Sequence, residues 1–311
     1  MVPDLLAWQW LVVFGLGAAA LVRSGVSLAG AGDELAERTG LGGLVTGMVL
    51  VALATSLPEL LTDVSAAAAG APDLAIGDLF GSSMANMAIL AVVDLVHRGR
   101  VWPRIGVGHA RVAAVAIALT AMAVLGIVIP EAPAIGWVGL DSLLIVAAYV
   151  AAMAWFRRSP GGLGVPTGWA ERPDAPGGSI RRAALTFAAA AAVVLVAAPI
   201  TAVAARELAE AAGIAQTTVG AGLLAIATSM PELIASLAAL RIGAHDLAVG
   251  NLFGSNAANM AVIVFADLAY RPGPILGAVD AAQVVAGVGA ILLMALAVAA
   301  IVGGTETRVW R

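Results

Sequence analysis

The stretch ALATSLPELL, residues Ala52–Leu61, places a threonine, a serine, a proline and a glutamate in the middle of an apolar segment of membrane length. An ionised carboxylate at that depth costs several kcal/mol, so such a residue normally faces a pore or a partner helix. Pro58 lacks an N–H group and its ring crowds the preceding turn, so we expect the carbonyls of Ala54 and Thr55 to lose their usual helical partners. Hydroxyls, free carbonyls and Glu59 then converge within one helical turn, and such oxygen donors suit hard cations.

The composition is that of a polytopic membrane protein. Of 311 residues, 61% are hydrophobic and 12% charged, which leaves too little polar surface for a soluble protein. The chain has no cysteine, which excludes disulfides and thiolate metal sites. The chain has no basic tract of the kind that binds nucleic acid. We therefore expect membrane lipid and small cations as partners, and no cofactor. The N-terminus carries Asp4 and no basic region, so it is interpreted as a retained first helix and not a cleaved signal.

Apolar windows of about 20 residues, the length that one span needs, predict five helices followed by four. The windows are residues 6–30, 43–69, 74–96, 109–129 and 136–156, then 183–205, 217–240, 247–269 and 279–303. Proline, glycine and charged residues between the two groups predict a flexible linker. The expected division is therefore a first repeat at 1–156, a linker at 157–182 and a second repeat at 183–311.

Arginine placement predicts the orientation of the bundle, because basic residues near helix ends stay on the cytoplasmic side. All 16 basic residues are arginine, and an external N-terminus leaves only Arg206 and Arg271 outside. The absence of lysine is typical of a G+C-rich prokaryotic genome. We therefore expect an integral protein of a prokaryotic plasma membrane, with the N-terminus outside and the linker in the cytoplasm.

The two halves repeat each other at an offset of 173 residues. The offset carries the letters T-S-x-P-E, ending at Glu59, onto the same letters ending at Glu232. It also carries GDLFGSSMANM, Gly77–Met87, onto GNLFGSNAANM, Gly250–Met260. Because the first half holds an odd number of helices, the second half enters the membrane from the opposite face. This is the inverted-topology repeat of secondary transporters, whose binding sites lie near the midplane at the repeat interface.

The repeated polar residues can hold either of two kinds of cation. Two glutamates offer up to two negative charges, which match one divalent cation, whereas two or three monovalent cations could use the same oxygens in turn. The two kinds of ion cannot bind the same carboxylates at the same time. Competition for common ligands is therefore a physical basis for exchange.

These motifs resemble the two α-repeats of the sodium/calcium exchanger (cation/calcium antiporter) superfamily, G-T-S-x-P-E followed by G-N-x-x-G-S-N-x-x-N. The resemblance implies Glu59 and Glu232 as the shared central ligands of calcium. It implies the other site residues as follows: Thr55 and Thr228 as calcium ligands through their backbone carbonyls, Ser56 and Ser229 lining the site, Ala52 with Ser82 and Ala225 with Ser255 at flanking sodium sites, and Asn86 and Asn259 in the middle of the cluster. It also implies alternating access, in which the long first helices of each half slide against the core.

Departures from the family pattern make the first repeat the more acidic one. Asp78 stands where the family has asparagine, which the second repeat keeps as Asn251, and Asp63 has Ser236 as its counterpart. We expect each aspartate either to tune the cation site or to lie in a solvated vestibule. The resemblance implies ten helices, but the offset carries Trp137 of the fifth window almost to the end of the chain. The tenth helix is therefore expected to be missing, through truncation or as a natural nine-helix variant.

The remaining titratable residues are expected to be structural. Asp94 and Asp267 lie near opposite membrane faces and are interpreted as end-of-helix charges. His97, His109 and His245 fall at cytoplasmic ends, where we expect them to be solvated and not part of a proton relay.

The sequence thus predicts a secondary active antiporter, and not an enzyme, that exchanges calcium for sodium or protons. A magnesium-transporting exchanger and a passive cation channel are the alternatives. Inverted repeats with broken helices favour the transporter over the channel. Magnesium would demand a rigid octahedral site, which a sequence does not reveal.

Overall fold

The computed structural model describes residues 6–39, 45–96, 106–129, 133–158, 179–211 and 229–306. Seven helices in these ranges are long and apolar enough to cross a membrane, which confirms the prediction of an all-α polytopic membrane protein. The elements in chain order are α1 (Ala7–Thr39), the π-helix η1 (Gly47–Val51), α3 (Ala52–Ala68), α4 (Pro72–Val96), α5 (Val107–Val128), β1 (Ala134–Ile135), β2 (Val138–Gly139), α6 (Leu140–Arg158), α7 (Ile180–Ala211), α9 (Met230–Arg241), α10 (His245–Ala269), the 3₁₀ turn η5 (Leu276–Ala278) and α11 (Gln283–Glu306).

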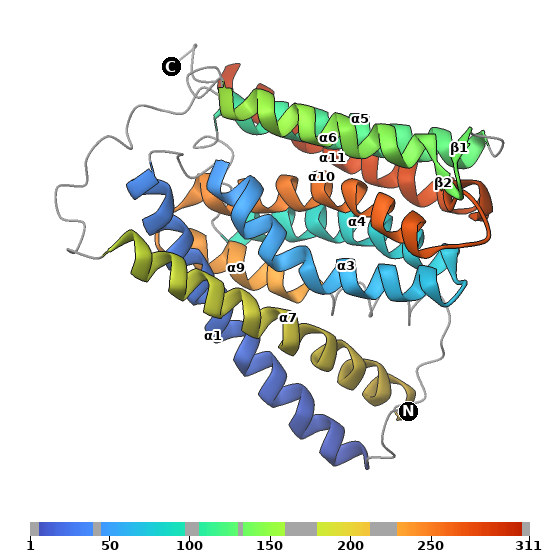
Figure 1. Cartoon of the computed structure of the whole chain (residues 1–311). Helices are drawn as coiled ribbons and strands as arrows, with labels where there is room; N and C mark the ends of the chain where they lie inside the picture. Colours follow the sequence, from blue (N-terminus) through green and yellow to red (C-terminus); the bar gives the residue numbers. More distant parts are fainter. Residues whose placement is uncertain are drawn as a thin grey trace.

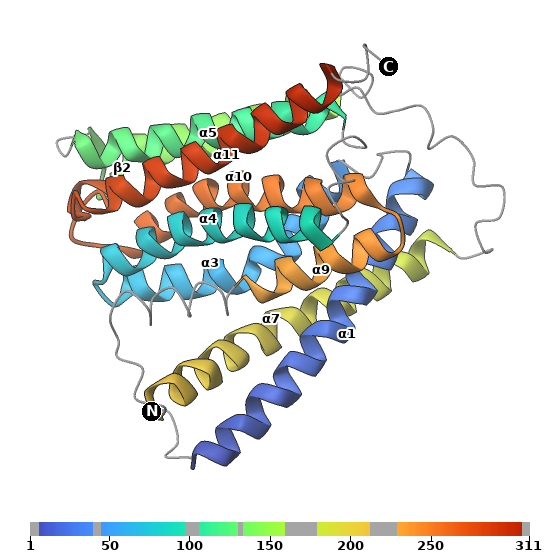
Figure 2. The ribbon, with the colours of Figure 1, turned by 180° about the vertical axis from the view of Figure 1, so that it is seen from behind.

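The helices form successive layers (Figure 1). One layer is the pair α1 and α7, which crosses the others obliquely; α3 and α9 follow, then α4 and α10, and finally α5, α6 and α11. Figure 2 shows the same order from behind. The halves of the chain interleave, because α1 packs on α9 of the second half while α7 packs on α3 of the first.

The helices α1 and α7 are longer than their apolar windows. The windows 6–30 and 183–205 were expected to bound them, but α1 ends at Thr39 and α7 runs from Ile180 to Ala211. In the last turns of α1, Arg38 Nε lies 2.8 Å from Glu34 Oε1, an i,i+4 pair that supports the helix, and Leu35 and Ala36 are buried. An apolar window therefore measures the membrane-facing part of such a helix and not its whole length.

The π-helix η1 immediately precedes α3 and packs tightly on α10. A Cβ atom added to Gly47 would overlap the backbone of Leu247, and one added to Gly254 would overlap the backbone of Met48. Gly254, a glycine of the second-repeat motif, thus allows close backbone approach. Single turns of π-helix inside α-helices are frequent at functional sites.

A two-stranded hairpin, β1 and β2, precedes α6 and was not predicted. It is tied to the end of α10 by Asp267, whose Oδ2 accepts a hydrogen bond of 2.8 Å from the Gly139 N–H. The Oδ1 atom of the same carboxylate accepts one of 2.7 Å from the Ile275 N–H. The structural role expected for Asp267 is therefore confirmed.

Candidate cation site

The helices α3 and α9 carry the two repeated glutamates into the protein interior. Pro58 lies inside α3, whereas Pro231 lies in the first turn of α9. The side chains that follow them, Glu59 and Glu232, are 1% and 0% exposed. Neither carboxylate faces lipid, as a cation-binding role requires.

Each glutamate is held by a serine from the opposite half of the chain. The Ser56 hydroxyl donates to Glu232 Oε1 over 3.3 Å, and the Ser229 hydroxyl donates to Glu59 Oε1 over 3.4 Å. The other carboxylate oxygen of each glutamate, Oε2, has no hydrogen-bond partner among the described residues. A buried carboxylate oxygen without a donor is an available ligand for a cation.

Asparagines from α4 and α10 connect the two halves beside the glutamates. The Asn86 amide nitrogen donates to Asn256 Oδ1 over 2.9 Å, and Asn256 in turn donates to the Ser83 carbonyl over 3.3 Å. The oxygens Oδ1 of Asn86 and of Asn259 have no partner within the described ranges. Asn256 was not among the predicted site residues, although it belongs to the repeated motif. The signal that could have found it is the family motif G-S-N-x-x-N, because the 173-residue offset pairs Asn256 with Ser83.

The remaining predicted residues that the structure describes are buried as well. The Ser82 hydroxyl lies beside the Glu59 carboxylate, and Ala52 is fully buried. Ser255 is also fully buried, and its hydroxyl has no hydrogen-bond partner in the described part of the chain. Thr55 directs its hydroxyl to the Val51 carbonyl (3.1 Å) and to Asn251 Oδ1 (3.3 Å).

Two predicted ligands, Ala225 and Thr228, lie outside the described residues. Their roles stay predictions, and so does the expectation that the Thr55 backbone carbonyl binds calcium. The other predicted residues are buried, and hydrogen bonds between the two halves link Ser56 to Glu232, Ser229 to Glu59 and Asn86 to Asn256.

Of the two extra aspartates of the first repeat, Asp63 is buried, and Asp78 is partly exposed with its Oδ2 atom buried. Asp63 is 1% exposed, so this side chain does not lie in a solvated vestibule. Its carboxyl group interacts with that of Asp78 and lies within electrostatic reach of Glu59. The counterparts in the second repeat form a neutral pair, in which Asn251 donates to the Ser236 hydroxyl over 3.1 Å.

Carboxylates dominate the electrostatics of this layer. The charged groups that act on Glu59 are Glu232 and Asp78, both acidic. Arg38 pairs with Glu34, and His109 contacts Asp246; neither of these contacts involves the site. Several buried carboxylates without a cationic side chain favour a bound cation, because uncompensated charge in a medium of low dielectric constant is costly.

One histidine differs from the sequence-based expectation of a solvated side chain. His109 is 1% exposed, and its Nε2 lies 3.2 Å from the Asp246 carbonyl oxygen and 3.6 Å from Asp246 Oδ1. The expectation of solvation was therefore wrong for His109. The pair joins the first turns of α5 and α10, away from the glutamates. His245 is exposed, and His97 lies outside the described residues.

Curated relatives share part of this chain. The putative antiporter CaxA of Alkalimonas amylolytica is 34% identical over 98 residues, which are 31% of this chain and 31% of CaxA. The sodium/calcium exchanger MaX1 of Methanosarcina acetivorans is 32% identical over 78 residues, 25% of this chain and 22% of MaX1. The matches thus span less than a third of the length of these relatives.

Solved structures share the fold over nearly the whole chain. The sodium-calcium exchanger NCX_Mj, soaked with 10 mM Na⁺ and no Ca²⁺, matches with a TM-score of 0.66 and 21% identity, over 97% of this chain and 96% of that one. The same exchanger soaked with 100 mM Na⁺ and 10 mM Sr²⁺ gives a TM-score of 0.65 at 22% identity, over 94% and 91% of the two chains. The family model described as "Sodium/calcium exchanger protein" matches residues 9–157 and 182–309. The chain belongs to the sodium/calcium exchanger family, a family of exchangers and not of enzymes.

Proposed function

We propose that this protein is a secondary active antiporter that moves calcium across the membrane in exchange for sodium or protons. The observation that carries the proposal is the reciprocal contact of Ser56 with Glu232 and of Ser229 with Glu59. These contacts bring one carboxylate from each half of the chain into one buried layer. A single cation between the halves can therefore take ligands from both.

Exchange follows from the charge and the donor types of this layer. The two glutamates supply two negative charges, while hydroxyl and amide oxygens supply neutral ligands of the kind that calcium and sodium accept. Two or three sodium ions would replace one calcium ion at the same carboxylates. Because both ions need Glu59 and Glu232, occupancy by one excludes the other and their movements become coupled.

Alternating access would come from the α1–α7 pair, which packs on α3 and α9 and crosses them obliquely (Figure 1). A shift of this pair along the core would open the buried layer to one membrane face and close it to the other. The inverted repeat supports the proposal, since its two halves can exchange conformations.

Flux measurements in proteoliposomes test the proposal. Calcium uptake should require an outward-directed gradient of sodium or protons and should reverse when that gradient is inverted. Crossing sodium, potassium and pH gradients identifies the driving ion, and replacing calcium by magnesium tests the alternative substrate. Calcium flux that ignores every counter-ion gradient would indicate a passive channel.

Substitution of the central ligands tests the site itself. Glu59→Gln and Glu232→Gln should each lower apparent calcium affinity by about 30-fold or more, because loss of one partner of a buried charged contact costs about 2–5 kcal/mol. Asp280→Asn is the matched control, since Asp280 is an exposed acid at one end of the bundle. Transport by either glutamine variant at the wild-type level would contradict the role of Glu59 and Glu232 as shared ligands.

The proposed orientation, with the N-terminus outside and the linker in the cytoplasm, is tested by labelling. The chain has no cysteine, so Ala69→Cys in the exposed connection between α3 and α4 introduces a single thiol. An impermeant maleimide should label it from outside intact cells. Labelling only after permeabilisation would show that the orientation is the opposite one.

A further inference from the structure

The two repeats differ one helical turn from their glutamates. Four residues after Glu59, α3 carries Asp63, where α9 carries Ser236 at the matching position. Four residues before Ser82, α4 carries Asp78, where α10 carries Asn251. The sequence offset thus pairs two acids in one half with two neutral polar residues in the other.

The neutral pair is satisfied by the protein alone. Asn251 donates to the Ser236 hydroxyl over 3.1 Å, and that hydroxyl donates to the Ala248 carbonyl over 3.3 Å. The Asn251 oxygen accepts from the Thr55 hydroxyl over 3.3 Å. Nothing further is needed to compensate these buried groups.

The acid pair is not satisfied by the protein. Both oxygens of Asp63 and the Oδ2 atom of Asp78 are buried and have no hydrogen-bond donor among the described residues. The two carboxyl groups nevertheless face each other. Two carboxylates that share a buried site repel each other, so a positive charge between them would compensate both.

The pair lies between the glutamates and one membrane face. Along α3, Asp63 lies between Glu59 and the connection to α4, and along α4, Asp78 lies between that connection and Ser82. The carboxyl group of Asp78 acts electrostatically on Glu59, and Glu59 acts in turn on Asp63. A cation that moves from this face to the central layer would meet the pair first.

We propose that Asp63 and Asp78 form a second cation site, which holds one of the transported metal cations on the way between the α3–α4 connection and Glu59. The identity of the cation as calcium or sodium rests on the proposed function, whereas the existence of the site does not. The second half has Ser236 and Asn251 at the equivalent place and forms no such site. The two membrane faces therefore differ in apparent cation affinity.

Calcium binding to the purified protein tests the site directly. The double variant D63S/D78N gives the first half the pair that the second half already forms, so it should fold. Titration of detergent-solubilised wild-type protein with ⁴⁵Ca²⁺ should give two binding events per chain, and D63S/D78N should lose the weaker one. Equal stoichiometry and affinity in both proteins would overturn the proposal.

The Glu59→Gln background separates this site from the central one. E59Q should lose transport and the tighter binding event but keep the weaker event, and E59Q/D63S/D78N should lose both. If wild-type protein transports no calcium while the weaker event is still lost in D63S/D78N, the second site stands and the proposed function fails.

A pH series provides the remaining arm of the experiment. If D63S/D78N changes only the pH dependence of transport and leaves calcium binding unchanged, the pair holds a proton and the metal site is refuted. The single variant D63N, which keeps the size of the side chain, repeats the measurement should the double variant not fold. Asp280→Asn removes a charge near the start of α4 and should leave both binding events intact.

Discussion

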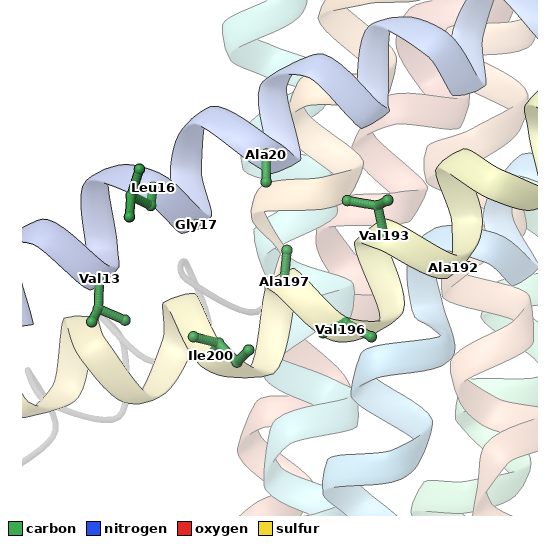
Figure 3. A pocket seen from close by; sticks show the side chains of 9 residues that line it. All are labelled: Val13, Leu16, Gly17, Ala20, Ala192, Val193, Val196, Ala197 and Ile200. Carbon is green, nitrogen blue, oxygen red and sulfur yellow. The ribbon is translucent and has the colours of Figure 1, made fainter. Parts of the chain in front are cut away.

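The α1–α7 pair and the block of helices that it crosses are packed in different ways. The two helices of the pair enclose an apolar groove of about 610 Å³, shown in Figure 3. Its lining residues are Val13, Leu16, Gly17, Ala20, Ala192, Val193, Val196, Ala197 and Ile200. The block formed by α3, α4, α9 and α10 instead buries serines, asparagines and carboxylates that bond across the two halves. Polar contacts between the two halves thus add to the apolar core of the block, whereas the groove between α1 and α7 is lined by apolar residues.

The contact between the pair and the block is apolar as well. Gly25 of α1 lies against Ile234 of α9, and Leu21, Leu28 and Val194 belong to a small apolar cluster of their own, separate from the main core. Apolar surfaces without directional bonds can slide past each other at lower cost than hydrogen-bonded ones. The difference supports a mechanism in which α1 and α7 move together as one unit and the block that holds the site stays intact.

Two disulfide crosslinks should distinguish movement of the pair against the block from movement within the pair. In G25C/I234C, which joins α1 to α9, oxidation should reduce transport to background because α1 can no longer shift. In G17C/T201C, which joins α1 to α7, oxidation should leave transport unchanged. A Cβ placed on Gly25 lies 3.1 Å from Ile234 Cβ, and one on Gly17 lies 3.3 Å from Thr201 Cβ, close to the about 3.5–4.5 Å of a disulfide. Flux before and after oxidation measures the effect.

Reduction with dithiothreitol is the control, since it should restore transport in G25C/I234C. The chain contains no cysteine of its own, so each bond formed is the intended one. Loss of transport in both oxidised variants would show that α1 and α7 move relative to each other, and retention in both would remove the sliding mechanism.

Alanine substitution of glycines should show a second difference between the block and the pair, in how tightly their helices are packed. A Cβ on Gly254 would lie 2.5 Å from the Met48 carbonyl oxygen, so Gly254→Ala must displace η1 from α10. Overpacking of this kind costs about 1–3 kcal/mol. We expect a lower temperature of unfolding in detergent and reduced transport, both measured on the purified protein.

Gly30 of α1 is the matched control. Nothing lies within 4 Å of a Cβ placed there, so Gly30→Ala adds no clash. Alanine also favours a helix interior over glycine by about 1 kcal/mol. Gly30→Ala should unfold at the same or a higher temperature than wild type; a decrease equal to that of Gly254→Ala would contradict the difference in packing.

The sequence alone predicted the fold class and the family because its signal is local. Polar residues repeated inside apolar windows mark both the spans and the site, and the family fold is confirmed. The lengths of α1 and α7 were not predicted, since charged residues in their last turns, such as Glu34 and Arg206, lower the hydropathy there even though Leu35 and Ala36 are buried. The roles of the individual ligands, including Glu59 and Glu232, stay predictions.

Contacts between distant parts of the chain were the features that sequence reasoning missed. His109 appeared solvated because its partner, Asp246, is 137 residues away. The amide bridge through Asn256 and the neutral pair of Ser236 and Asn251 likewise depend on how α4, α9 and α10 pack. Asp63 was expected either to tune the site or to be solvated, and only the packing of α3 on α4 showed that it is buried against Asp78.

Removal of single hydroxyl groups should show the smallest difference between the block and the pair. Ser56→Ala and Ser229→Ala each remove a bond of 3.3–3.4 Å to the glutamate of the opposite half. A hydrogen bond to a charged group contributes about 1.5–3 kcal/mol, and these long ones belong at the lower end, so apparent calcium affinity should fall by about tenfold in both variants. The hydroxyl of Thr201 in α7 donates only to the Ala197 carbonyl of its own helix, over 2.7 Å, so Thr201→Val should leave calcium affinity unchanged. Similar losses in the two serine variants would show that both glutamates contribute equally to calcium binding. A loss in one variant alone would assign the calcium to the glutamate that this serine contacts.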